Sequence, residues 1–97
     1  AVPILYTRGG EGATLHADGK VWRALPPAVR VVDSVGAGDC SLAGLLSSVL
    51  RRPERGWGEH LRASVAAGTG ACLAAGATPP SDELVERLAG EVRVSGG

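Results

Sequence analysis

Phenylalanine and methionine are absent from this sequence of 97 residues, and its aromatic residues are Tyr6, Trp22 and Trp57. Hydrophobic residues nevertheless make up 44% of the chain. A chain of this length buries only a limited share of its surface. We therefore expect at most one small domain, whose core consists of leucine, valine and alanine with these three aromatic residues.

Cysteine is also scarce, and charge of one sign does not predominate. Cys40 and Cys72 are far apart and form no C-x-x-C unit, which argues against a metal site and a disulfide scaffold and makes the cytoplasm the default location. Lysine plus arginine and aspartate plus glutamate both number 10, so the charge favours neither a nucleic-acid nor a membrane partner. No apolar run approaches the roughly 20 residues of a membrane span.

The N-terminus has neither an initiator methionine nor the basic-then-apolar order of a signal peptide. Its opening, Ala1 to Leu5, is typical of the interior of a fold.

We expect strands at residues 4–7, 13–16, 20–25 and 29–32. Asp18-Gly19 lies between the second and third strands, and this pair favours a type I′ hairpin turn.

Helices are predicted after the strands. They are expected from Gly38 to about Arg52, from Glu59 to about Ala75, and from Ser81 onward, with residues 91–97 as a tail. This order suits the C-terminal layer of a larger α/β protein. We therefore expect the chain to be a piece of a longer one.

The most informative segment is the turn Gly36-Ala37-Gly38 followed by Asp39. A strand that passes into a helix through glycines leaves the first backbone N–H groups unpaired at the positive end of the helix dipole, where anions bind. A carboxylate there would repel a phosphate unless a metal or a proton transfer uses it. Phosphoryl transfer needs both an anion-stabilising site and a group that takes the proton of the acceptor hydroxyl. The amides and Asp39 could supply both.

Other interpretations of this segment stay open. Asp39 could be an ordinary first-turn acid at a tight strand–helix turn. Asp33 and Ser34 are interpreted as turn or capping residues, or as residues whose carbonyls hold a monovalent cation. Two common phosphate motifs are excluded: G-x-x-x-x-G-K-[ST] is absent, and Ser41 stands where a dinucleotide-binding turn needs its third glycine.

A second glycine group, from Thr7 to Gly12, also follows a strand. It is a turn by its composition, but together with the first group it could form the other wall of a nucleotide site. Arg8 would then meet a phosphate or remain a solvated charge. Gly68 and Gly70, within a predicted helix, would permit close approach of another backbone or of a flat ligand.

Three further residues are expected to be structural. Cys40 is interpreted as a small packing residue, because no activating partner is evident. His16 and His60 are isolated in sequence, and we expect both at the surface.

The segment from Asp33 to Asp39 resembles the C-terminal signature D-T-x-G-A-G-D of the ribokinase/PfkB family of carbohydrate kinases. The segment from Thr7 to Ala13 is similar to the family's T-x-G-x-x-G-A, which lies beside the nucleotide phosphates. The hairpin matches in place, and so does the small-residue helix that precedes Gly76. The resemblance covers nearly the whole chain and implies the C-terminal portion of a ribokinase-like three-layer α/β/α fold, with residues 1–97 as its nucleotide-binding segment.

The resemblance also implies an activity. Asp39 would be the catalytic base that deprotonates the sugar hydroxyl, and the amides of Gly36, Ala37 and Gly38 would form the anion hole. The residues implied in cofactor binding are Thr7, Gly9, Gly12, Gly68 and Gly76. ATP and Mg²⁺ would be bound, and a monovalent cation could accompany them. The full-length protein would bind a sugar or sugar phosphate and could form a homodimer.

Residues 40–46 are similar to the S-x-x-A-G-F-L run of the 1-phosphofructokinase and tagatose-6-phosphate kinase branch, although Cys40 replaces its usual serine and Asp33 its usual asparagine or serine. The implied reaction is ATP-dependent phosphorylation of fructose 1-phosphate to fructose 1,6-bisphosphate. The alternatives are another sugar or nucleoside kinase of the family, acting on tagatose 6-phosphate, ribose or fructose, or a non-catalytic nucleotide-binding module. The isolated 97 residues are expected to be inactive, because the sugar contacts would lie elsewhere.

Overall fold

The computed structural model describes residues 3–8, 11–28, 36–73 and 80–97. The elements in chain order are β1 (Ile4–Thr7), β2 (Ala13–Ala17), β3 (Lys20–Leu25), α1 (Ala37–Arg51), α2 (Trp57–Ala71), α3 (Asp82–Ala89) and β4 (Arg93–Gly96). The strand expected at residues 29–32 lies outside the described residues. The other expected strands and helices are confirmed, with ends that shift by a few residues.

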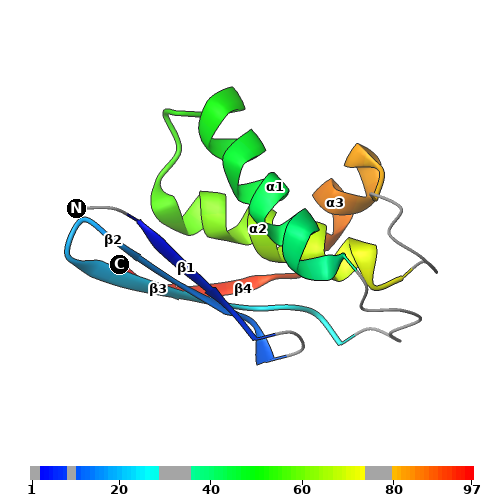
Figure 1. Ribbon diagram of the computed structural model, residues 1–97, viewed down its shortest axis with the longest axis horizontal. Coiled ribbons are helices and arrows are strands. Elements are labelled where there is room, and N and C mark those ends of the chain that lie inside the picture. Colours follow the sequence, from blue (N-terminus) through cyan, green and yellow to red (C-terminus); the bar gives the residue numbers. More distant parts are fainter. Residues whose placement is uncertain (1–2, 9–10, 29–35, 74–79) are drawn as a thin grey trace.

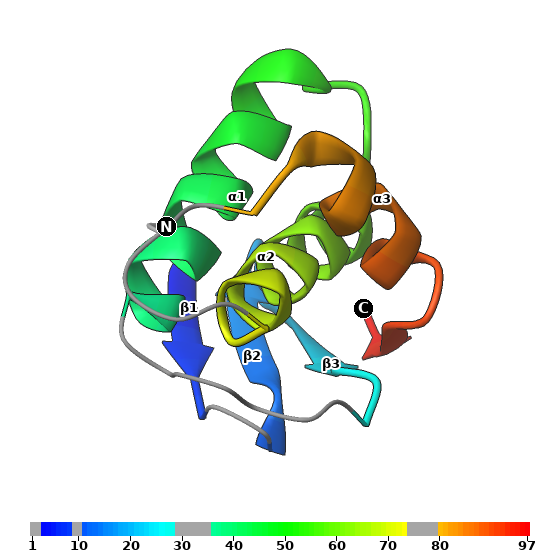
Figure 2. The same cartoon turned by 90° about the vertical axis from the view of Figure 1, so that its right-hand side faces the viewer.

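The four strands form one antiparallel sheet in the order β1-β2-β3-β4. All three helices cover the same face of this sheet (Figure 1). Turned by 90°, the molecule shows α2 in the middle of the helix layer, with α1 over the β1 side and α3 over the β4 side (Figure 2). The described residues therefore supply two layers of an α/β fold.

The predicted hairpin is confirmed. Asp18 and Gly19 both have positive φ, 53° and 73°, and Ala17 pairs with Lys20 across the turn. Two successive positive φ angles are the mark of a type I′ turn, which matches the natural twist of the two strands. The register then points alternate residues of β2, among them Leu15, toward the helices.

The core lies between the sheet and α2, and it consists of leucine, valine and alanine as expected. Its buried members are Ala13, Leu15, Ala24, Leu61, Val65, Ala66, Leu88 and Val92. Trp22 and Trp57 are half-buried at its margin. The expectation for Tyr6 was wrong, since this side chain is 59% exposed. It pairs with Thr14 on the face of the sheet that bears no helix.

The expected C-terminal tail was also wrong, because residues 93–96 form β4. This strand pairs with β3 through Ala24↔Val94 and Leu25↔Arg93, and Val92 just before it is buried in the core. Two valines in an otherwise polar segment of this length are a weak strand signal. The pairing depends on contact with β3, which is about 70 residues earlier in the chain.

The helix ends follow local chemistry. Ser81 caps α3, since its Oγ accepts a hydrogen bond of 3.2 Å from the Leu84 N–H. The second helix begins at Trp57 and ends at Ala71, somewhat earlier at both ends than expected. Among the described residues, no helix is long and apolar enough to cross a membrane.

Candidate active site

The N-terminus of α1 has the geometry of an anion site. Gly36 is the N-cap and has a φ of 78°, a left-handed conformation that favours glycine. The first helical hydrogen bond runs from the Cys40 N–H to the Gly36 carbonyl at 2.9 Å. The N–H groups before Cys40 therefore have no partner within the helix, and no described side chain caps them.

Space is available beside these amides. A Cβ atom added to Gly38 would meet no described atom within 4 Å, and the residue is exposed. The Asp39 carboxylate, in the same turn, is also exposed. One helical turn thus brings together amide donors at the positive end of the helix dipole and one carboxylate able to accept a proton.

The first turn of α1 is held against α2. Ser64 Oγ donates a hydrogen bond of 2.7 Å to the Ser41 carbonyl, and both residues are buried. A Cβ at Gly68 would overlap the Ser41 hydroxyl. Gly68 therefore lets the two helices approach at the turn that carries Asp39, and the close partner that the structure shows for this glycine is another helix.

Backbone hydrogen bonds join the described residues on the two sides of Gly9 and Gly10. The Arg8 N–H donates to the Gly12 carbonyl at 2.8 Å, and the Glu11 N–H donates to the Arg8 carbonyl at 3.1 Å. Gly12 is buried with a φ of 93°, and a Cβ there would overlap the Ala24 carbonyl. Glycine is thus required at position 12 for the close approach of β3.

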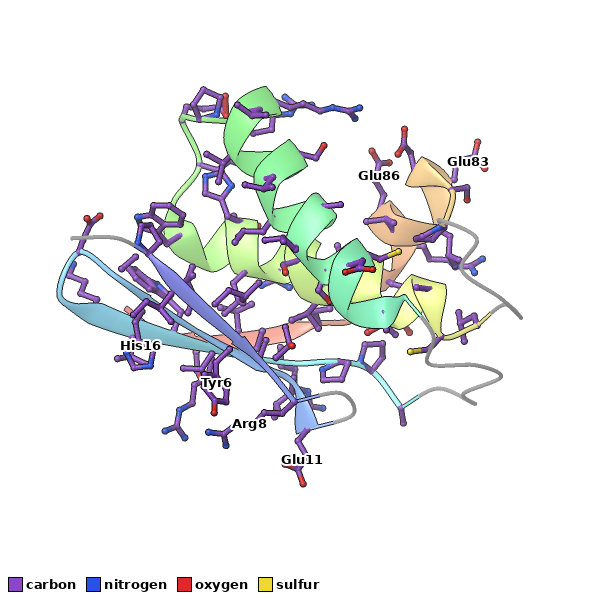
Figure 3. The ribbon with its side chains drawn as sticks, viewed as in Figure 1. Tyr6, Arg8, Glu11, His16, Glu83 and Glu86 are labelled. Atoms are coloured by element: carbon purple, nitrogen blue, oxygen red, sulfur yellow. The ribbon has the colours of Figure 1, made fainter. Side chains whose placement is uncertain are left out.

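The Arg8 side chain is exposed, which agrees with the interpretation of Arg8 as a solvated charge. Its guanidinium carbon lies 5.4 Å from the centre of the Tyr6 ring, at cation–π distance. Figure 3 shows both side chains with Glu11 and His16 on the side of the sheet away from the helices. Arg8 therefore lies on the opposite face from α1.

Thr7, at the end of β1, and the start of α1 lie at the same end of the molecule (Figures 1 and 2). The end of β1 and the start of α1, which belong to the two predicted walls, thus lie at one end. Gly9, Gly76, Asp33 and Ser34 fall outside the described residues, so their roles stay predictions.

The expected surface position of His60 was wrong, because the residue is 3% exposed. Its Nδ1 lies 2.7 Å from Ser48 Oγ, and its ring meets Trp57 edge-on with centroids 5.6 Å apart. Desolvation by burial is the main cause that lowers the pKa of His60 below 6.5. The polar partner of this histidine, Ser48, belongs to α1, so the sequence of α2 alone did not indicate the burial.

A groove of about 370 Å³ lies between α1, α2 and α3. Its lining includes Cys40, Ser47, Arg51, Arg55, Asp82 and Glu86. Cys40 is a half-buried free thiol on this lining. The groove carries charges of both signs and is separate from the exposed Asp39.

Comparison with known proteins places this geometry in a family. Residues 3–84 match the pfkB family of carbohydrate kinases. The chain is 40% identical over 65 residues to 1-phosphofructokinase of Escherichia coli K12 and, to the same extent, to that of Shigella flexneri. These matches cover 66% of this chain, and the chain spans 20% of the length of these curated relatives.

Solved structures show the same fold. Phosphofructokinase-2 from Escherichia coli, in complex with potassium, superposes with a TM-score of 0.84 at 24% identity over 92% of this chain and 28% of its own. The nucleoside kinase of Methanocaldococcus jannaschii, an archaeal member of the ribokinase family, gives a TM-score of 0.75 at 27% identity over 89% and 29%. The described sheet and helices are thus part of a ribokinase-like α/β fold, and the chain belongs to the pfkB family of carbohydrate kinases.

Proposed function

We propose that residues 1–97 are the C-terminal, nucleotide-binding segment of an ATP-dependent phosphosugar kinase. The observation that carries this proposal is the first turn of α1. This turn contains both the amides from Gly36 onward, which have no partner within the helix, and the exposed Asp39 carboxylate. Anion binding and proton acceptance are the two protein functions that phosphoryl transfer to a hydroxyl requires.

The proposed mechanism is an in-line transfer. Asp39 accepts the proton of the attacking sugar hydroxyl, while the amides of Gly36, Ala37 and Gly38 stabilise the charge on the transferred γ-phosphoryl group. Thr7, Gly9 and Gly12 border the ATP phosphates. Gly68 acts by letting α2 support the first turn of α1, and Gly76 flanks the adenine.

Mg²⁺ accompanies ATP in this proposal as the counter-charge of its phosphates. A monovalent cation is proposed at the carbonyls of Asp33 and Ser34, with support from the potassium complex of the structurally similar phosphofructokinase-2. We assign Mg²⁺ no protein ligand among the described residues.

Fructose 1-phosphate is the substrate we propose, because the curated relatives with 40% identity are 1-phosphofructokinases. A nucleoside kinase is the second candidate, supported by the 27% identity and shared fold of the archaeal enzyme. The proposed protein is cytoplasmic, has no nucleic-acid or membrane partner and forms a homodimer at full length. We propose that the isolated chain is inactive, because it spans a fifth of these relatives.

A chimeric kinase tests the function. In it, this chain replaces the matched fifth of Escherichia coli 1-phosphofructokinase. Asp39→Asn should lower kcat for fructose 1-phosphate by roughly 10²–10⁴-fold, while KM for ATP changes little, because the variant loses the base and keeps the amides. Glu91→Gln, the same chemical change at another exposed carboxylate, should retain activity. Near-normal turnover of Asp39→Asn would overturn the assignment of the base.

A further inference from the structure

Helix α1 has a second apolar face that the described fold leaves bare. Leu42, Leu46 and Leu50 are 50%, 53% and 80% exposed. Their spacing of four residues aligns them along one side of the helix. We call these three residues the leucine stripe. An exposed row of large apolar side chains on a helix is typical of a surface that another element covers.

The direction of the stripe follows from its neighbours. The buried face of α1, formed by Ser41, Leu45 and Ser48, packs on α2. One flank, which includes Ser47 and Arg51, lines the groove shared with α3. At 100° per residue, the leucine stripe lies on the opposite flank. It therefore faces away from α3, toward the side where the described helix layer ends (Figure 2).

The sheet ends on the same side. β1 is an edge strand, and the described residues offer no strand to pair with its outer edge. In Figure 2, α1 lies over β1 at this margin of the molecule. The unpaired strand edge and the leucine stripe thus form one continuous boundary, at which both layers are open to extension.

Asp39 belongs to the same flank. It precedes Leu42 by three residues, Leu46 by seven and Leu50 by eleven, which places all four on one side of α1. An element that covers the stripe therefore lies beside the carboxylate. The proposed catalytic base therefore lies at the boundary of the described fold.

We propose that the leucine stripe docks the part of a pfkB-family kinase chain that the relatives contain and these 97 residues do not match. The length of the relatives supports this occupant, because the chain spans 20% of the curated 1-phosphofructokinases and 28% of phosphofructokinase-2. This inference rests on the proposed function, since docking would bring the sugar-holding residues to Asp39.

A second copy of this chain fits the stripe less well. A stable protein interface buries about 1,200–2,000 Å² in total, and three partly exposed leucines offer much less. The rest of a kinase chain can extend the sheet at β1 and cover the stripe at once, which gives one large interface. The position of Asp39 at the end of the stripe favours the same partner.

The test uses the unmatched four-fifths of Escherichia coli 1-phosphofructokinase, purified as a separate fragment and titrated by calorimetry against this chain. We expect binding. Leu46→Gln should weaken it at least tenfold, and Leu42→Gln with Leu46→Gln should abolish it. Two controls should bind as the unaltered chain does: Leu46→Met, which stays apolar, and Arg51→Gln, which places the same new side chain on the groove flank of α1.

Circular dichroism and thermal melting of the isolated variants should remain close to those of the unaltered chain, because the leucines are exposed there. Three results would overturn the proposal: absence of binding, equal binding by Leu46→Gln, or a stripe-dependent dimer of this chain that excludes the fragment. Asp39→Asn should bind the fragment normally. A complex that depends on Leu46 but lacks kinase activity would uphold the docking surface and contradict the proposed function.

Discussion

Ser64 of α2 donates a hydrogen bond of 2.7 Å to the main-chain carbonyl of Ser41, two residues after Asp39. Both serines are buried, so this bond holds the first turn of α1 against α2. The exposed Asp39 carboxylate thus belongs to a helical turn that a buried hydrogen bond holds in place. This hydrogen bond can be removed by a substitution in α2 that leaves Asp39 and the amides of α1 unchanged.

Ser64→Ala removes this hydrogen bond. We expect the free energy of unfolding to fall by about 1 kcal/mol, because the buried carbonyl loses a partner. Urea unfolding of the isolated chain measures the loss. In the chimeric kinase, kcat should fall more than KM for ATP changes, since Asp39 is less well positioned. Ser95→Ala, at an exposed serine, is the control, and equal stability of both variants would contradict the role of the bond.

Gly68→Ala places a methyl group against the Ser41 hydroxyl. Alanine gains about 1 kcal/mol of helix propensity over glycine, yet we expect a net loss of about 1–2 kcal/mol from the forced separation of α1 and α2. Ser41→Ala in the same chain should restore most of the loss, because it removes the overlapping oxygen. A double-mutant cycle in urea measures this coupling. A stabilising Gly68→Ala would show that the helices are further apart than described.

The stability of the chain should depend on pH through His60. Burial lowers its pKa in the folded state below the ordinary value of 6.5, so the unfolded state binds the proton first. The contribution of His60 is therefore complete above about pH 6.5 and is lost as the pH falls toward its folded pKa.

Urea titrations at several pH values between 7.5 and 5 measure this dependence. His60→Asn, which keeps an acceptor near Ser48 Oγ and cannot titrate in this range, should flatten the curve. His16→Asn, the same change at an exposed histidine, is the matched control. A pH dependence that survives in His60→Asn would assign the proton uptake to other groups.

Val92→Ala tests the C-terminal strand region. Val92 is 3% exposed and belongs to the core cluster, so we expect a loss of roughly 1–3 kcal/mol on thermal or urea unfolding. The matched change Val21→Ala, at a valine that is 40% exposed, should cost much less. Equal, small effects would restore the interpretation of residues 91–97 as a tail.

Local chemistry made much of this fold predictable. Asp18-Gly19 specified its hairpin turn, Ser81 its helix cap, and the apolar periodicity its three helices, because these signals act within a few residues. The start of α1 was predictable for the same reason: Gly36 adopts the left-handed conformation for which glycine is suited. The resemblance to the family signature is the source of the proposed role of Asp39.

Features that depend on distant contacts were not predictable. β4 forms because β3 offers an edge, and His60 is buried because α1 brings Ser48 to it. The leucine stripe was apparent as an apolar run, but its exposure becomes evident only once α2 is seen to cover the other face of α1.

The position of β4 at the end of the sheet has a consequence for biosynthesis. Residues 93–96 pair with β3, and Arg62 of α2 donates hydrogen bonds to the Ala89 and Val92 carbonyls just before them. Because a ribosome releases the chain from its N-terminus, the hairpin and α1 emerge well before the strand that pairs with β3. The nascent protein must therefore expose one side of its core until β4 has left the exit tunnel.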